Sequence, residues 1–134
     1  MYLLDTNILS ELVKKKPNPN FIERLKSEPA RSIYTSSICV FELRFGSALR
    51  DDFNTFWQRI MDSIILRISI LKFGENEAFL AGDILAQLQK KGQILGVEDV
   101  YIAATALSHK CTLITANIRH YKRIKGLKIE NWIS

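Results

Sequence analysis

The sequence predicts an α/β protein in which helices cover both faces of a mainly parallel sheet. Short apolar runs of strand type alternate with longer segments of helical periodicity, and this alternation is typical of parallel sheets. The length of 134 residues suits one domain with one core, so we expect a single domain over residues 1–134. The predicted architecture is therefore a three-layer α/β/α domain, in which the strand order stays open.

The expected elements begin with an apolar strand that ends at Asp5. A helical pattern starts at once, and Thr6 and Asn7 can cap it. Further strands are expected at 33–35, 67–71, 111–115 and 129–133. Further helices are expected at 20–26, 38–49, 51–66, 75–91, 97–110 and 117–123. Helical spacing predicts two buried faces, formed by Ile38, Phe41, Phe45, Ala48 and Leu49 and by Phe79, Ile84, Leu85 and Leu88.

Charge and composition favour some classes of partner and compartment. The net charge of +5 and a pI near 9.3 suit an anionic partner, of which nucleic acid is the commonest. No apolar run is long enough for a membrane helix, and Asp5 and Glu11 interrupt any signal-peptide pattern, so we expect a cytoplasmic protein. Cys39 and Cys111 lack metal-type spacing and lie in apolar patterns, which predicts buried thiols in a reducing compartment.

Four polar side chains are expected at one edge of the sheet. Asp5 and Asn117 follow buried strands, Glu42 borders the apolar stripe of its helix, and Asp99 starts another helix on its inward side. The carboxyl ends of parallel strands share an edge, and ligands bind there. Each residue also has an ordinary structural interpretation, because Asp5, Asp99 and Asn117 could cap helices and Glu42 could pair with an arginine.

Together these residues indicate a metal site. Carboxylates that gather without cations repel one another, and a hard divalent ion such as Mg²⁺ or Mn²⁺ removes the repulsion. A metal-bound water loses its proton more easily and can attack phosphorus. The sequence shows no Ser-His-Asp or Cys-His set and no Gly-rich phosphate loop, and neither His109 nor His120 is paired with a nucleophile.

The same motifs, in this order, resemble a PIN domain along the whole chain. The resemblance is carried by Asp5-Thr6-Asn7, by Ser36-Ser37 leading to Glu42-Leu43 and Gly46, by Asp99 before Ile102-Ala103-Ala104, and by Thr115 with Asn117. The C-terminal part is similar to the VapC toxins of bacterial type II toxin–antitoxin pairs, through Asn117-Ile118-Arg119-His120-Tyr121, Ile124, Gly126-Leu127 and Glu130-Asn131-Trp132.

This resemblance implies a Mg²⁺-dependent endoribonuclease that acts on structured RNA, usually a tRNA or ribosomal RNA loop. It also implies a homodimer and a cognate antitoxin that blocks the site. Asp5, Glu42 and Asp99 match the three core acidic positions of the family, and Asn117 matches a fourth that is Asp in many members and Asn in others. An amide is a weaker Mg²⁺ ligand than a carboxylate. His120 stands where many relatives carry Glu, which removes one more acid.

Residues around the acidic positions have expected supporting roles. Thr115 would orient the acidic side chains, with Thr6 and Asn7 as further supporting residues. A basic rim for RNA phosphates is expected at Arg119, Lys122 and Arg123, with Lys14 to Lys16, Lys90, Lys91, Lys125 and Lys128, although such charges can also be plain solvated surface. Phe53, Phe56 and Trp57 are expected in the core or a dimer surface, and base stacking is the less favoured interpretation.

The antitoxin is expected to insert an arginine into the acidic pocket and to compete there with the metal. Its apolar part would lie on the first two helices, around Leu12 and Phe21. Two alternatives stay open. One is a catalytically weakened PIN-fold module that binds RNA or protein. The other is a receiver-like Mg²⁺-binding signalling domain, which would need paired acids after the first strand and an acid after Ile70-Leu71.

Overall fold

The first strand, β1 (Tyr2–Leu4), lies at the centre of a five-stranded parallel sheet. The computed structural model describes residues 1–133, and its sheet has the order β3-β2-β1-β4-β5, with every neighbouring pair parallel. The other strands are β2 (Ile33–Ser36), β3 (Ser69–Leu71), β4 (Thr112–Ile114) and β5 (Ile129–Glu130). Leu3 pairs with Tyr34 on one side and Leu113 on the other, which confirms the predicted fold class.

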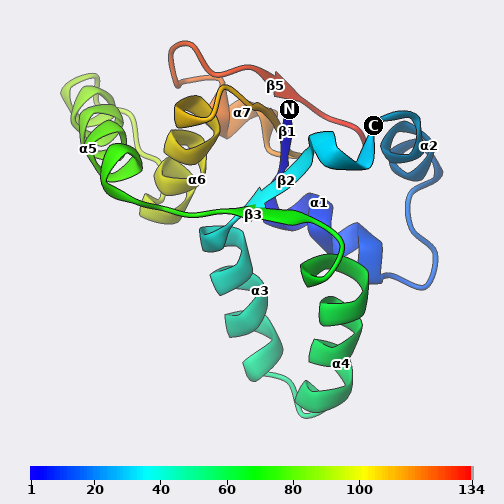
Figure 1. The fold of residues 1–134 in the computed structure, drawn as a ribbon. Coiled ribbons are helices and arrows are strands. Elements are labelled where there is room, and N and C mark those ends of the chain that lie inside the picture. The colour runs from blue at the N-terminus through cyan, green and yellow to red at the C-terminus, as the bar shows by residue number, and fades with distance from the viewer. Residues whose placement is uncertain (134) are drawn as a thin grey trace.

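Helices lie on both sides of this sheet (Figure 1). α5 (Glu75–Lys90) packs on α6 (Val97–Ser108) on one side, and α1 (Thr6–Leu9), α2 (Pro19–Ser27) and α4 (Phe53–Ile60) lie on the other. α3 (Ser37–Ala48) contacts both α1 and α6 and, paired with α4, extends away from the sheet. The short helix α7 (Ile118–Tyr121) follows β4, and single turns occupy Ser10–Val13, Ala30–Ser32 and Met61–Ile65. Within residues 1–133, none of the helices combines the length and apolar character that crossing a bilayer requires.

The core forms where the central strands meet the helices. Leu3, Leu4, Leu113 and Ile114 are fully buried, which fits strands covered on both faces. The third strand starts at Ser69, two residues later than predicted, because the backbone N–H groups of residues 67 and 68 still bond to the carbonyl of Ile64. The last strand ends at Glu130, so it is shorter than the predicted 129–133.

The predicted buried face of α3 holds at Ile38, which is partly buried against the core, and is wrong from Phe41 onward. Cys39, Leu43 and Ser47 point inward, whereas Phe41, Phe45 and Leu49 are 56, 59 and 73% exposed. α3 projects beyond the sheet edge, so its later turns pack mainly on α4 and the phenylalanine stripe stays in solvent. On α5, Ile84 and Leu88 are buried as predicted, but Phe79 is 65% exposed. The carboxylate of Glu77 takes part of the inward face instead.

The aromatic residues of α4 are covered by arginines of the same chain. Phe56 and Trp57 are half-buried and pack against the core, which agrees with the core interpretation. The guanidinium of Arg44 lies 4.6 Å from the ring centre of Phe53 and 4.7 Å from that of Trp57, while that of Arg50 lies 3.8 Å from Phe56. These stacked cations occupy faces that base stacking would need.

Candidate active site

Asp5 stands where β1 ends and α1 begins, and its side chain is 4% exposed. One carboxylate oxygen accepts a bond of 2.8 Å from the backbone N–H of Thr6, so Asp5 caps α1. The other accepts a bond of 2.7 Å from the Thr115 hydroxyl, which comes from the end of β4. Asp5 therefore caps its helix and also anchors the edge where β1 and β4 end.

Thr6 and Asn7 do not cap α1, contrary to the sequence prediction. The Thr6 hydroxyl donates a bond of 2.6 Å to Glu42, and the Asn7 side-chain oxygen accepts one of 3.3 Å from the backbone N–H of Ala116. Because Asp5 already serves the helix start, these two side chains are free to join α1 to α3 and to the segment after β4.

Glu42 is half-buried on α3 and faces Asp5. Ser36 caps α3 through a bond of 3.0 Å from the backbone N–H of Cys39, and Glu42 lies one turn after Cys39 on the same side. No ion pair reaches Glu42 within residues 1–133, so the arginine pairing considered from the sequence does not form. Ligand atoms of Asp5, Cys39 and Glu42 all lie within 4.8 Å of one another.

Asp99 is half-buried in the first turn of α6, and its side chain does not cap that helix. It accepts a bond of 3.0 Å from the hydroxyl of Tyr121, a fully buried residue of α7. Burial, together with the charges of Asp5 and Asp99, raises the pKa of Tyr121 far above its usual range, so this hydroxyl stays a donor. Asp99 lies outside the tight group of Asp5, Cys39 and Glu42 but close enough to influence the Asp5 charge.

Asn117 is exposed at the start of α7, and its side chain does not cap that helix. Its backbone N–H donates a bond of 3.0 Å to the Thr115 hydroxyl, which in turn donates to Asp5. The structure therefore joins Asn117 to the site through Thr115. Arg119, Lys122 and Arg123 are exposed nearby in sequence, and the Arg123 guanidinium donates a bond of 2.8 Å to the carbonyl of Ile94.

The electrostatics of the pocket favour a bound cation. Burial, and then the charges of Asp99 and Glu42, raise the pKa of Asp5 from 3.8 to about 6, although the bonds from Thr115 and Thr6 oppose this shift. Among residues 1–133 no lysine, arginine or histidine forms an ion pair with Asp5, Glu42 or Asp99. Carboxylate oxygens that converge without a partner cation suit a hard divalent ion, so the residues present fit Mg²⁺ or Mn²⁺.

Sequence reasoning missed two residues of this site. Cys39 carried a usable signal, because it lies three residues before Glu42 and so shares its side of the helix. The spacing of residues gave no signal for Tyr121, because its contact with Asp99 joins two helices that are distant in the sequence.

Comparison with known proteins places this geometry in a family. The PIN-domain profile matches residues 2–127. Ribonuclease VapC2 of Haemophilus influenzae is 33% identical over 132 residues, covering 98% of both chains. The tRNA(fMet)-specific endonuclease VapC of Salmonella typhimurium is 32% identical over 133 residues, covering 98% of this chain and 97% of the relative. A chain in the crystal structure of VapBC2 from Rickettsia felis, bound to a promoter DNA fragment, superposes with a TM-score of 0.89 at 32% identity and covers 98% of each chain. The chain therefore belongs to the PIN-domain family, in the group of the VapC ribonucleases.

Proposed function

We propose that this chain is a metal-dependent endoribonuclease toxin that cuts structured RNA, such as a tRNA or ribosomal RNA loop, and is silenced by a cognate antitoxin. The observation that carries the proposal is the convergence of Asp5, Glu42 and Asp99 from three separate elements with no cation between them. Named relatives that are ribonucleases, one of them specific for tRNA(fMet), support the substrate class.

In this proposal Asp5, Glu42 and Asp99 hold a divalent ion, Mg²⁺ or in its place Mn²⁺. When bound, the ion supplies an acidified water and a charge that screens the phosphodiester. The chain fixes the ligand geometry through hydroxyls: Thr115 holds Asp5, Thr6 holds Glu42, and Tyr121 holds Asp99. These donors hold each carboxylate in place before the phosphate arrives.

The RNA backbone would contact basic residues beside the pocket. Arg119 and Lys122 are exposed directly after Asn117, and Lys125 and Lys128 continue the positive charge towards β5. Phosphate contacts of this kind position the substrate without reading its sequence. Arg123 is already tied to the Ile94 carbonyl, so its guanidinium is the least free of the three residues proposed for RNA binding.

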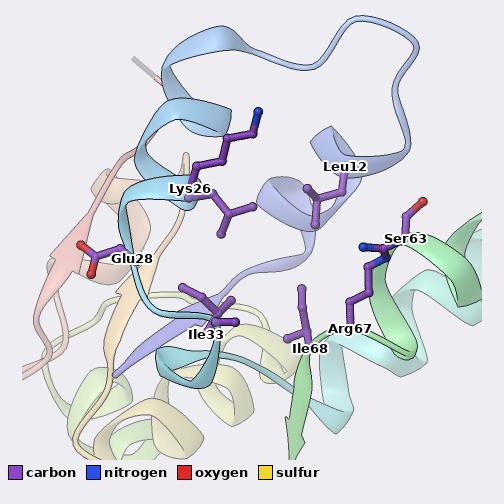
Figure 2. A pocket seen from close by; sticks show the side chains of 9 residues that line it. Leu12, Lys26, Glu28, Ile33, Ser63, Arg67 and Ile68 are labelled. Carbon is purple, nitrogen blue, oxygen red and sulfur yellow. The ribbon is translucent and has the colours of Figure 1, made fainter.

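The antitoxin is proposed to lie in an apolar groove of about 500 Å³ between the turn after α1, α2 and the segment before β3. Figure 2 shows Leu12, Ile33 and Ile68 converging on this groove, with Lys26 and Arg67 beside it. Of the two residues expected in the antitoxin platform, Leu12 lines this groove, whereas Phe21 is fully buried and offers no surface to a partner.

Cleavage by an Asp99→Asn variant tests the enzymatic proposal. We expect wild-type protein to cut RNA with Mg²⁺ and not with EDTA, and Asp99→Asn to abolish cleavage while the melting temperature in EDTA is kept or raised. Glu98→Gln is the matched control, because this exposed carboxylate precedes Asp99 on the same turn. Mapping the RNA ends then identifies the substrate. An active Asp99→Asn protein would rule out the assignment.

Complex formation tests the groove. Ile68→Glu places a charge among its apolar lining and should weaken binding of the antitoxin, whereas Leu66→Glu, at a 71% exposed position outside the lining, should not. If the antitoxin also inserts an arginine, high Mg²⁺ should weaken inhibition and an Arg→Ala change in the antitoxin should relieve it. If neither high Mg²⁺ nor the Arg→Ala change alters inhibition, the antitoxin blocks the site sterically and inserts no arginine.

A second candidate function is a catalytically weakened PIN-fold binding module. The exposed and uncharged Asn117 at the fourth position favours it. A binding module would bind RNA or protein without cutting RNA at any Mg²⁺ concentration. The cleavage assay described above therefore distinguishes the binding module from the nuclease. The family match excludes the receiver-like alternative.

A further inference from the structure

A small hollow outside the acidic pocket is lined by positive charge. It measures about 30 Å³ and lies between the last turns of α5 and the turn that follows α7. Its floor is apolar, formed by the buried side chains of Ile84, Leu88 and Ile124. Space of this size admits one or two atoms as large as a water, so it suits the oxygens of a phosphate and excludes a base. The polar residues of its wall are Gln87, Lys91, Arg123 and Lys125.

The three cations of this wall have no acidic partner. Among the described residues, 1–133, no carboxylate forms an ion pair with Lys91, Arg123 or Lys125. The negative end of α5 accounts for a cation at Lys91, which follows that helix. It does not account for Arg123 and Lys125, which come from a separate segment after α7. Cations that gather beside a buried apolar floor repel one another, and an anion placed between them removes the repulsion.

The guanidinium of Arg123 is held in place for such an anion. One of its amines donates a bond of 2.8 Å to the carbonyl of Ile94, in the segment between α5 and α6. A guanidinium has five N–H donors, so this bond fixes its orientation and leaves other donors for a ligand. The planar fork that these donors form can bind two oxygens of one phosphate.

Two contacts tie this hollow to the acidic pocket. Tyr121, two residues before Arg123, donates to Asp99. Arg123 itself donates to Ile94, five residues before Asp99. Because five residues span at most roughly 18 Å, the hollow stands at a fixed and short distance from the acidic pocket. A strand of RNA that enters the acidic pocket can therefore reach both places.

We propose that Lys91, Arg123 and Lys125 form a phosphate seat, which binds a backbone phosphate of the RNA strand beside the one that is cut. This inference rests on the proposed function, because it takes the anion to be RNA. The phosphate seat sets the path of the strand across Asp99 and reads no base, as is usual for phosphate contacts. Lys91 thereby brings the end of α5 into the RNA interface.

Salt-dependent RNA binding tests the phosphate seat without cleavage. A fluorescein-labelled stem-loop RNA is titrated with wild-type protein in EDTA, and the slope of log affinity against log salt concentration is measured by anisotropy. Lys91→Gln and Lys125→Gln should each weaken binding and reduce this slope by roughly 0.7–1, the value for one lost phosphate contact. Arg31→Gln is the matched control and should keep the slope, because the exposed Arg31 precedes β2 at the end of the sheet away from Asp5.

Two further measurements separate the phosphate seat from diffuse positive charge and from a site for free phosphate. Arg123→Lys keeps the charge but loses the planar fork that serves Ile94 and the ligand together. The salt slope should therefore stay, while the RNA affinity falls roughly 10-fold. Inorganic phosphate, which replaces chloride at constant ionic strength, should not displace the RNA.

The proposal is overturned if wild-type protein binds no RNA in EDTA, if both lysine variants keep the wild-type slope, or if Arg31→Gln lowers it equally. Displacement of the RNA by inorganic phosphate would assign the hollow to a free anion and overturn the assignment to RNA. Because binding is measured in EDTA, failure of the phosphate seat leaves metal-dependent cleavage standing. A protein that binds RNA through the phosphate seat but never cuts it contradicts the proposed nuclease and leaves the phosphate seat standing.

Discussion

Asp5 lowers the stability of the metal-free protein at neutral pH. Its pKa is about 6 in the folded protein against 3.8 for a free side chain, and burial is the main cause. The folded state thus holds this proton more tightly, so the stabilising contribution is complete below pH 4 and is lost as the pH rises through 6. At about 1.4 kcal/mol for each pH unit, the charge on Asp5 costs about 3 kcal/mol.

Asp5→Asn should therefore be more stable than wild-type protein in EDTA above pH 6 and close to it near pH 4. The measurement is chemical unfolding across this range. Asp83→Asn, at an exposed position of α5, should leave the profile unchanged. Equal stability of Asp5→Asn and wild-type protein at pH 7 would show that Asp5 carries no penalty.

Asn117→Asp should tighten Mg²⁺ binding, because it adds a charged oxygen beside residues that already hold Asp5. A calorimetric Mg²⁺ titration compares Asn117→Asp with wild-type protein. Asn20→Asp is the control, because it adds the same charge on α2, far from Asn117 along the chain. If the midpoint of the Mg²⁺ titration moves equally in Asn117→Asp and Asn20→Asp, the change in net charge explains the shift and residue 117 is not a ligand.

At the scale of elements, Glu77 joins the start of α5 to the end of α6. Its buried carboxylate accepts a bond of 2.9 Å from the backbone N–H of Gly74 and another from the Ser108 hydroxyl, and His109 lies 4.0 Å away. The Ser108 bond is the main cause that lowers the pKa of Glu77. A lowered pKa means that this stabilisation is present above the free value and is lost as the pH falls.

Glu77→Ala should destabilise the protein by about 2 kcal/mol at pH 7, since it leaves a backbone and a hydroxyl donor without their acceptor. Glu75→Ala, an exposed carboxylate of the same first turn, should cost much less. Urea unfolding measures both variants. Similar losses in the two variants would mean that the Glu77 bonds add nothing beyond the charge at the helix start.

The elements could be predicted from the sequence better than their orientation. Apolar spacing located the helices and strands, because periods of 3.6 and 2 follow from local geometry. The same spacing failed on α3, where Phe41 and Phe45 form a regular stripe that no part of residues 1–133 covers. A period shows that a stripe exists, but the partner that covers it is set by tertiary packing.

At the scale of the whole molecule, this stripe is the surface on which we expect a second copy. The Phe41 and Phe45 rings are stacked with their centres 6.3 Å apart, and Leu49, four residues further along the chain, is exposed as well. Exposed apolar patches of this kind mark association sites. Phe45→Lys should convert a dimer into a monomer in light scattering, whereas Leu66→Lys should leave the dimer intact. A dimeric Phe45→Lys protein would place the contact elsewhere.

The place of Asp5 could be predicted because the ends of parallel strands share an edge, whereas Glu42 and Asp99 reach that edge from helices. The strand order β3-β2-β1-β4-β5 could not be predicted, since it depends on pairings between segments distant in sequence. The contact of Tyr121 with Asp99 could not be predicted for the same reason. Cys39 was missed because its apolar neighbours favoured a core thiol, although its spacing of three residues from Glu42 puts the two side chains on one side of the helix.

The central place of β1 has a consequence for the order of events during synthesis. Asp5 leaves the ribosome almost first, but its partners Asp99 and Thr115 follow only after roughly 5 to 20 s at translation rates of about 5–20 residues per second. Every residue that lines the apolar groove, from Leu12 to Ile68, is made before Asp99. With the antitoxin site proposed above, a waiting partner would meet its binding segments on the nascent chain before Asp99 joins Asp5, so that capture would precede activity.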